Sequence, residues 1–157
     1  MREAGGRDWS VGVAVVLFLA AHFLLRPLIV TWAVGPDLLA GGVLLASLHA
    51  RSGVAAGVGF GAGLLEGAAA LEAMGTLGAI FALGGYAAAR ARELFFADSP
   101  LFLPAFVFVG VWAFRLAEQA ATGAASGWQG WLLEAPASAA ITTVLVVVAD
   151  RLVTPRP

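Results

Sequence analysis

Arg115 and Glu118 are the two side chains whose types and spacing best suit chemistry in this chain. They stand three residues apart in an apolar segment, so on a helix they would lie on adjacent parts of one face. If that segment spans a membrane, its charges are costly and usually face protein or water, which makes the pair a candidate partner-binding site. The alternative is an interfacial arginine that extends toward lipid headgroups beside an acidic neighbour. Both interpretations stay open at the level of sequence.

Glu66 and Glu72 invite comparison with a general acid and base. Catalytic carboxylates of the glycosidase kind must face one substrate at a defined separation. Nothing in the sequence sets such a separation, and no polar residues that would line a pocket accompany the two glutamates. We therefore interpret them as residues that close a short exterior turn. The same interpretation applies to Glu134, at the outer end of the last apolar segment.

His22 and His49 are the only histidines, and each stands at the end of a different apolar segment. A metal site usually takes three or four ligands, and no acidic or histidine cluster accompanies either residue. Ser47 and Ser52 flank His49 without an acid to orient its ring, which disfavours a hydrolase triad. The chain contains no cysteine and no lysine, so it has no thiolate site and no Walker-type loop. We expect no catalytic residue, no metal site and no cofactor.

The segments that carry these residues are strongly apolar. Hydrophobic residues make up 61% and charged residues 12% of the 157-residue chain, which exceeds the apolar share of an ordinary soluble domain. A net charge of −1 argues against a nucleic-acid binder, which needs a basic face. The charged start leads into the apolar run Val11–Leu25, and Arg26-Pro27 is a poor cleavage context for a signal peptide. We predict one integral membrane domain that retains this run.

Breaks in the apolar pattern divide the chain into six predicted transmembrane helices within one domain, residues 1–157. Crossing a membrane takes about 20 residues, and the second segment is short for that length. The predicted spans are residues 10–25, 37–52, 53–71, 74–89, 100–118 and 132–150. Pro36 and Asp37 supply the start of the second helix. A polar connection that holds Arg90, Arg92 and Glu93 is expected after the fourth. The predicted fold class is an all-α membrane protein.

The distribution of arginines indicates the orientation. Six spans place both termini on one side of the membrane, and cytoplasmic loops carry an excess of basic residues. With cytoplasmic termini, only Arg26 and Arg115 of the nine arginines lie toward the outside. The cytoplasmic ones are then Arg2, Arg7, Arg51, Arg90, Arg92, Arg151 and Arg156. We predict that both termini are cytoplasmic.

Glycines recur every four residues along the third predicted helix. They form two series, Gly53, Gly57 and Gly61, and Gly59, Gly63 and Gly67. Residues four apart stack on one face, so each series makes a groove without side chains, on roughly opposite sides of the helix. In a bilayer, small residues let helices approach closely and gain dispersion contacts. We predict that this helix is central, with neighbours packed on both grooves.

Several motifs in residues 35–94 resemble those of a known family. They are Pro36-Asp37-Leu38-Leu39, His49-Ala-Arg51, Gly57-Val-Gly-Phe60-Gly-Ala-Gly-Leu64-Leu65-Glu66, Thr76-Leu77-Gly78 through Gly84-Gly85-Tyr86, and Arg90-Ala-Arg92. With Arg115-Leu-Ala-Glu118 downstream, the string resembles the rod shape-determining protein MreD, a small bacterial inner-membrane protein. Glu66 stands where that family usually has aspartate, and Arg115 where an apolar or aromatic residue is commoner.

The resemblance implies a non-catalytic role in lateral cell-wall growth. Such a protein lies in membrane lipid and binds the MreC scaffold. It helps place a RodA-type glycosyltransferase and a penicillin-binding transpeptidase near the MreB filament. The family's fold is similar to that of the substrate-binding subunits of energy-coupling-factor vitamin transporters, which supplies an alternative function. Such subunits couple to an ATPase through small residues on the first helix. Here Ala14, Ala20 and Ala21 do not form an alanine ladder of spacing four, so this alternative ranks second.

Overall fold

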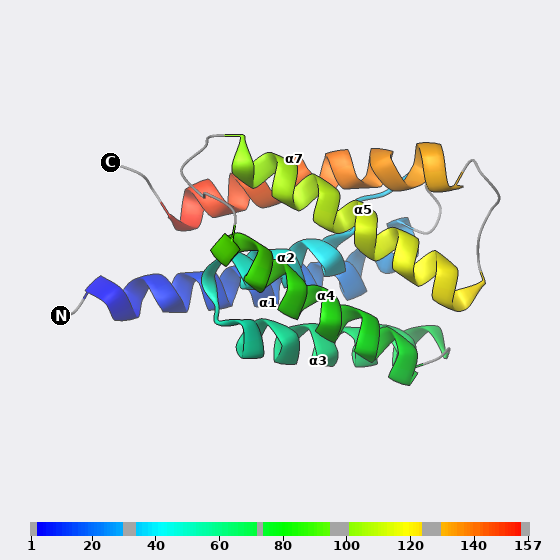
Figure 1. Cartoon of the computed structure of the whole chain (residues 1–157), viewed down its shortest axis with the longest axis horizontal. Helices are drawn as coiled ribbons and strands as arrows, with labels where there is room; N and C mark the ends of the chain where they lie inside the picture. Colours follow the sequence, from blue (N-terminus) through cyan, green and yellow to red (C-terminus); the bar gives the residue numbers. More distant parts are fainter. Residues whose placement is uncertain (1–2, 30–33, 72–73, 95–100, 124–129, 155–157) are drawn as a thin grey trace.

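The structure is a computed structural model, and it describes residues 3–29, 34–71, 74–94, 101–123 and 130–154. Within these ranges the chain is helical and contains no strand (Figure 1). The elements are α1 (Glu3–Ile29), α2 (Leu38–His49), α3 (Ser52–Ala70), α4 (Met74–Leu94), α5 (Phe102–Thr122), the π-helical turn η1 (Gly130–Glu134) and α7 (Ala135–Val153). The predicted all-helical fold is confirmed.

The apolar character of the helices is compatible with a membrane protein. In the described part of the chain, four helices are long and apolar enough to cross a membrane, namely α1, α3, α5, and α7 together with the end of η1. Helix α2 is apolar but has only 12 residues. Each predicted span overlaps a helix of the structure, and the last one overlaps both η1 and α7. That α2 and α4 also cross the membrane stays a prediction.

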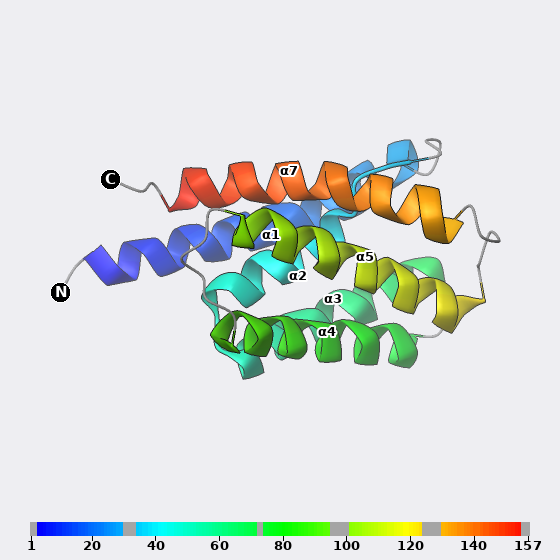
Figure 2. The ribbon, with the colours of Figure 1, turned by 45° about the horizontal axis from the view of Figure 1, so that its top comes forward.

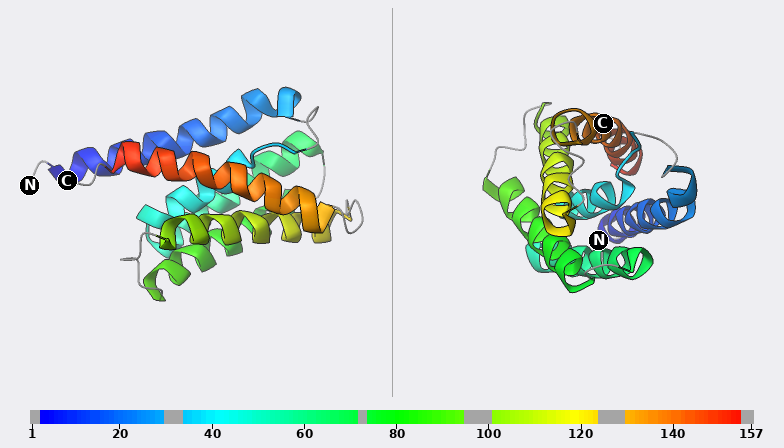
Figure 3. Two further views of the ribbon diagram at one scale, coloured as in Figure 1. Left: turned by 90° about the horizontal axis from the view of Figure 1, so that it is seen from above. Right: turned by 90° about the vertical axis from the view of Figure 1, so that its right-hand side faces the viewer.

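Successive helices alternate in direction, so their ends gather at two ends of the molecule (Figure 1). The start of α1, the end of α4, the start of α5 and the end of α7 lie together, and we call this the termini end (Figure 3). At the opposite end, which we call the far end, α3 ends and α4 begins. The described part of the chain thus begins and ends at the same end of the molecule.

The central helix is α2, and the prediction that the glycine helix occupies the centre is wrong. Every residue from Leu38 to Ser47 is buried, and α2 contacts α1, α3, α4, α5 and α7. The other helices surround it on all sides (Figures 2 and 3). Its sequence is apolar all round, a pattern typical of a buried helix. The even distribution of leucine, alanine and glycine around α2 was the signal for this position.

Several helix boundaries differ from the prediction, and three of them show why. Helix α1 begins at Glu3 instead of residue 10. Helix α2 ends at His49, because Ala50 takes an extended conformation that breaks the helix before α3 starts. Helix α4 continues to Leu94, so Arg90 and Arg92 lie on its last turns and not in a polar connection. Apolar patterning marks where a helix is buried in hydrocarbon, whereas charged residues can continue a helix beyond that boundary.

One glycine series of α3 packs directly against the backbone of α4. A Cβ atom at Gly59 would overlap the carbonyl oxygen of Phe81, and one at Gly63 would overlap that of Leu77. On α4, Gly85 has the reciprocal position, since its Cβ would lie 2.6 Å from the carbonyl oxygen of Ala55. No larger residue fits at these positions without moving a helix. The predicted close packing is therefore confirmed for this side of α3, where Gly67 is also buried.

The other glycine series faces away from the rest of the described chain. A Cβ atom at Gly53, Gly57 or Gly61 would meet no atom within 4 Å. The prediction that both glycine grooves pack against neighbours is wrong for this series. Helix α3 lies at the edge of the molecule, beside α4 and α2, so only one of its sides can be covered (Figure 3).

Candidate functional site

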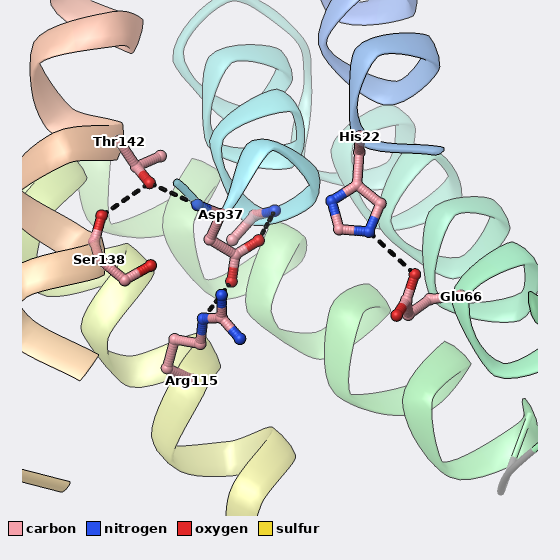
Figure 4. A network of polar contacts seen from close by, with 7 residues as sticks. His22, Asp37, Glu66, Arg115, Ser138 and Thr142 are labelled. Carbon is pink, nitrogen blue, oxygen red and sulfur yellow. Dashed lines mark hydrogen bonds and ion pairs between the residues drawn. The ribbon is translucent and has the colours of Figure 1, made fainter. Parts of the chain in front are cut away.

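Charged and polar side chains from five helices meet near the far end of the molecule (Figure 4). They form two groups. The aspartate cluster consists of Asp37, Arg115, Ser138 and Thr142, and the glutamate cluster consists of His22, Arg26 and Glu66. Each cluster joins helices that are distant in the sequence.

Asp37 is the centre of the aspartate cluster. As predicted, it begins α2, and its Oδ1 accepts a hydrogen bond of 3.0 Å from the backbone N–H of Ala40. Its own backbone N–H donates to Oγ1 of Thr142 at 2.7 Å. Its Oδ2 lies 2.9 Å from Nε of Arg115. A single residue, only 3% exposed, therefore ties α2 to both α5 and α7.

The Asp37–Arg115 pair compensates charge at the start of a buried helix. The carboxylate side chain is 4% exposed and that of Arg115 is 33% exposed, so the acid depends on the arginine more than the reverse. A buried carboxylate without a counter-charge is strongly unfavourable. Next to the pair, Oγ1 of Thr142 donates to the carbonyl oxygen of Ser138 at 2.8 Å. The hydroxyl of Ser138 points toward the pair (Figure 4).

The main partner of Arg115 is not the one that sequence spacing indicated. Glu118 interacts electrostatically with Arg115, but the stronger electrostatic partner is Asp37, whose Oδ2 lies 2.9 Å from Nε of Arg115. A signal for this pairing existed in the sequence. An aspartate that caps an entirely apolar helix leaves one carboxylate oxygen in need of a cation. A partner contact through Arg115 and Glu118 stays a prediction.

The glutamate cluster links α3 to α1. Oε2 of Glu66 lies 3.0 Å from Nε2 of His22, and Oε1 lies 3.3 Å from a terminal guanidinium nitrogen of Arg26. His22 and Arg26 are four residues apart and so share a face of α1. The Glu66 side chain is 17% exposed. The prediction that Glu66 closes an exterior turn is wrong, because its carboxylate pairs with two side chains of α1. Glu72 lies outside the described residues.

Polar contacts also fix the other end of α2. Nε2 of His49 lies 3.3 Å from Oδ1 of Asp150 on α7, so this histidine too has an acid that sequence adjacency did not reveal. On the facing side, Arg92 of α4 donates to the carbonyl oxygen of Leu48. The hydroxyl of Ser47 lies near backbone carbonyl oxygens of α2 and α4, at 2.8 and 3.1 Å, and not against the histidine.

The polar contacts of the described residues hold α2 in place. Polar residues anchor both ends of this central helix to α4, α5 and α7, and the glutamate cluster adds a bridge between the outer helices α1 and α3. Among the residues that the structure describes, no group of three or more histidine, aspartate or glutamate side chains is placed to hold a metal ion. Glu134, the residue before α7, is exposed.

No family model, curated protein or solved structure matches the chain. The resemblance of its motifs to those of MreD stays a prediction.

Proposed function

We propose that the chain is a non-catalytic membrane component of the bacterial lateral cell-wall elongation complex, of the MreD kind. It binds an MreC-like scaffold and supports a RodA-type glycosyltransferase with its penicillin-binding transpeptidase. It thereby contributes to peptidoglycan synthesis and to cell shape. In this proposal the domain has six transmembrane helices and lies in the cytoplasmic (inner) membrane, with both termini in the cytoplasm.

The proposal is supported by the contacts that residues of the MreD-like motifs make between helices. Asp37 and Glu66, which belong to two of the motifs that resemble MreD, make ion pairs between helices. Gly59 and Gly63, from the glycine-rich motif, allow the backbones of α3 and α4 to touch. A chain that uses its intramembrane charges to hold its own helices in place is suited to presenting a fixed surface to partners.

The distribution of charge supports the proposed orientation. Arg51, Arg90, Arg92 and Arg151 belong to the termini end, which should then face the cytoplasm. Arg26 and Arg115 belong to the far end, and each is paired there with a carboxylate. Reporter fusions after Ser52 and Pro157 should be cytoplasmic, and a fusion after Pro36 exterior. The reverse pattern would contradict the orientation.

Deletion of the gene tests the function. Loss of a lateral-elongation component should turn rod-shaped cells round, and an affinity-tagged copy should restore the rods and co-purify the MreC-like scaffold. A vitamin-transporter subunit gives a different result, since its deletion should abolish uptake of one vitamin and leave cell shape unchanged. Normal shape together with no scaffold recovery would overturn the proposal.

A further inference from the structure

An apolar groove is lined by residues of α4 and α5, two helices that lie next to each other in Figure 2. Its volume is about 800 Å³, and every residue that lines it is apolar. The lining extends from Phe102 to Ala117 along α5, which corresponds to about 22 Å at 1.5 Å per residue. That length is about three quarters of a bilayer's hydrocarbon core, which is about 30 Å thick. Leu44 of α2 forms the floor.

Small residues produce the hollow. Ala87 and Ala88 line it on α4, and Ala113 and Ala117 line it on α5. None of these alanines carries a side chain beyond Cβ, so they leave unfilled the space that larger side chains would occupy. At Gly84 the two helices are in contact, because the ring of Phe114 lies against this glycine. Because α5 is apolar and long enough to span a membrane, the groove opens toward hydrocarbon and not toward water.

The end of the groove at the termini end is basic. Ala91 is the last lining residue on α4, and Arg90 and Arg92 flank it on the helix. Arg92 donates to the carbonyl oxygen of Leu48, one turn beyond the floor residue Leu44, so its guanidinium lies where the floor ends.

Arg90 is the arginine at this end with the greater freedom to bind. Its side chain is 52% exposed and forms an ion pair of 2.6 Å with Glu93 through one nitrogen. An exposed pair of this kind contributes little to stability. A guanidinium has five N–H donors, so an anion could bind to Arg90 without displacing Glu93.

We infer that the α4–α5 groove is a binding site for one anionic phospholipid, whose acyl chains lie in the apolar groove and whose phosphate is held by Arg90 at its basic end. The acyl chains match the groove, which offers only apolar contact, and the phosphate matches the positive charge at its end. Basic pockets between transmembrane helices are known to select anionic headgroups. A partner's transmembrane helix would also fit between small-residue walls, but it would make no use of the arginine. The inference does not depend on the proposed function.

Thermal unfolding of the purified chain in a neutral detergent tests the inference. Added phosphatidylglycerol should raise the midpoint by several degrees, because a ligand that binds only the folded state stabilises it. Phosphatidylcholine with the same acyl chains should raise it much less. Equal responses to the two lipids would overturn the inference, because the site would then not recognise the headgroup.

Two variants separate the headgroup contact from the groove. Arg90→Gln should require about fivefold more phosphatidylglycerol for the same shift, since one basic residue near a membrane surface contributes that factor. Its control is Arg151→Gln, which removes an exposed arginine from the same end of the molecule but from α7. Ala113→Trp should fill the groove and abolish the shift, whereas Ala140→Trp, on an exposed position of α7, should not.

Native mass spectrometry of the same proteins provides a readout that does not depend on unfolding. Wild type and both controls should retain one phosphatidylglycerol, and Ala113→Trp should lose it. Retention by Ala113→Trp, or an unchanged response of Arg90→Gln, would overturn the inference.

Discussion

The two sides of α3 carry the same residue type at the same spacing, yet they have opposite surroundings. Gly59 and Gly63 touch the backbone of α4, whereas Gly57 and Gly61 face no atom of the described chain. The difference shows that a small-residue ladder makes close packing possible but does not by itself bring a neighbour. The neighbour is supplied by α4, whose Gly85 completes the contact from the other side.

The largest expected effect comes from filling the covered side. Gly63→Leu would place a side chain inside the α4 backbone, and overpacking at that site should lower the free energy of unfolding by about 3 kcal/mol or more. Gly61→Leu, the matched control on the outward side, should change it by less than about 0.5 kcal/mol. Unfolding in detergent measures both. Equal losses would mean that the outward series is also covered in the folded protein, for instance by a second copy.

The buried ion pair at the start of α2 should rank next. Asp37→Asn keeps a residue that caps helices well but removes the carboxylate that forms the ion pair with Arg115. Breaking a fully buried pair costs about 3–5 kcal/mol, and because Arg115 is 33% exposed we expect about 2–3 kcal/mol. Glu93→Gln, in the exposed pair with Arg90, is the control and should cost less than about 1 kcal/mol.

A double variant sharpens this comparison. Asp37→Asn combined with Arg115→Gln should recover part of the lost stability, because the guanidinium that has lost the Asp37 carboxylate is then removed as well. If the double variant is no more stable than Asp37→Asn, the cost belongs to the cap or to the Thr142 contact and not to the ion pair.

The glutamate cluster should be weaker, because it joins two outer helices. Glu66→Gln removes the charge that faces His22 and Arg26 but keeps a polar side chain of the same length. Hydrogen bonds to charged groups contribute about 1.5–3 kcal/mol, and the 29% exposure of Arg26 places the expected loss near the lower limit. A loss greater than that of Asp37→Asn would contradict the central role that we assign to α2.

Glu118 lies on the same helix as Arg115, and Glu118→Gln should have a smaller effect than Asp37→Asn or Glu66→Gln. Arg115 keeps Asp37 as its counter-charge, so we expect a loss of about 1 kcal/mol or less. A loss as large as that of Asp37→Asn would contradict the assignment of Asp37 as the main partner. Recovery of the MreC-like scaffold should be measured on the same variant. A drop in recovery without a drop in stability would place Glu118 in the partner contact.

Much of the fold follows from local patterns, which short segments carry by themselves. The extent of α3 was predicted to within one residue at each end, because apolar composition and the turns around it are local features. Asp37 was predicted to begin α2, because a cap depends on the next three residues only. Helix ends that carry charged residues were predicted less accurately. In the last turns of α4, for example, hydropathy falls but the helix continues.

What the sequence alone determined is an all-helical, apolar chain with six helical segments, the cap at Asp37 and one helix able to pack closely. Only the tertiary structure decided which glycine series is covered, that α2 is central, and that Arg115 pairs with Asp37 and Glu66 with His22. The physical reason is the same in each case. Periodicity fixes which residues share a helix face, but the rotation of a helix about its axis and its choice of neighbours depend on all the other helices at once.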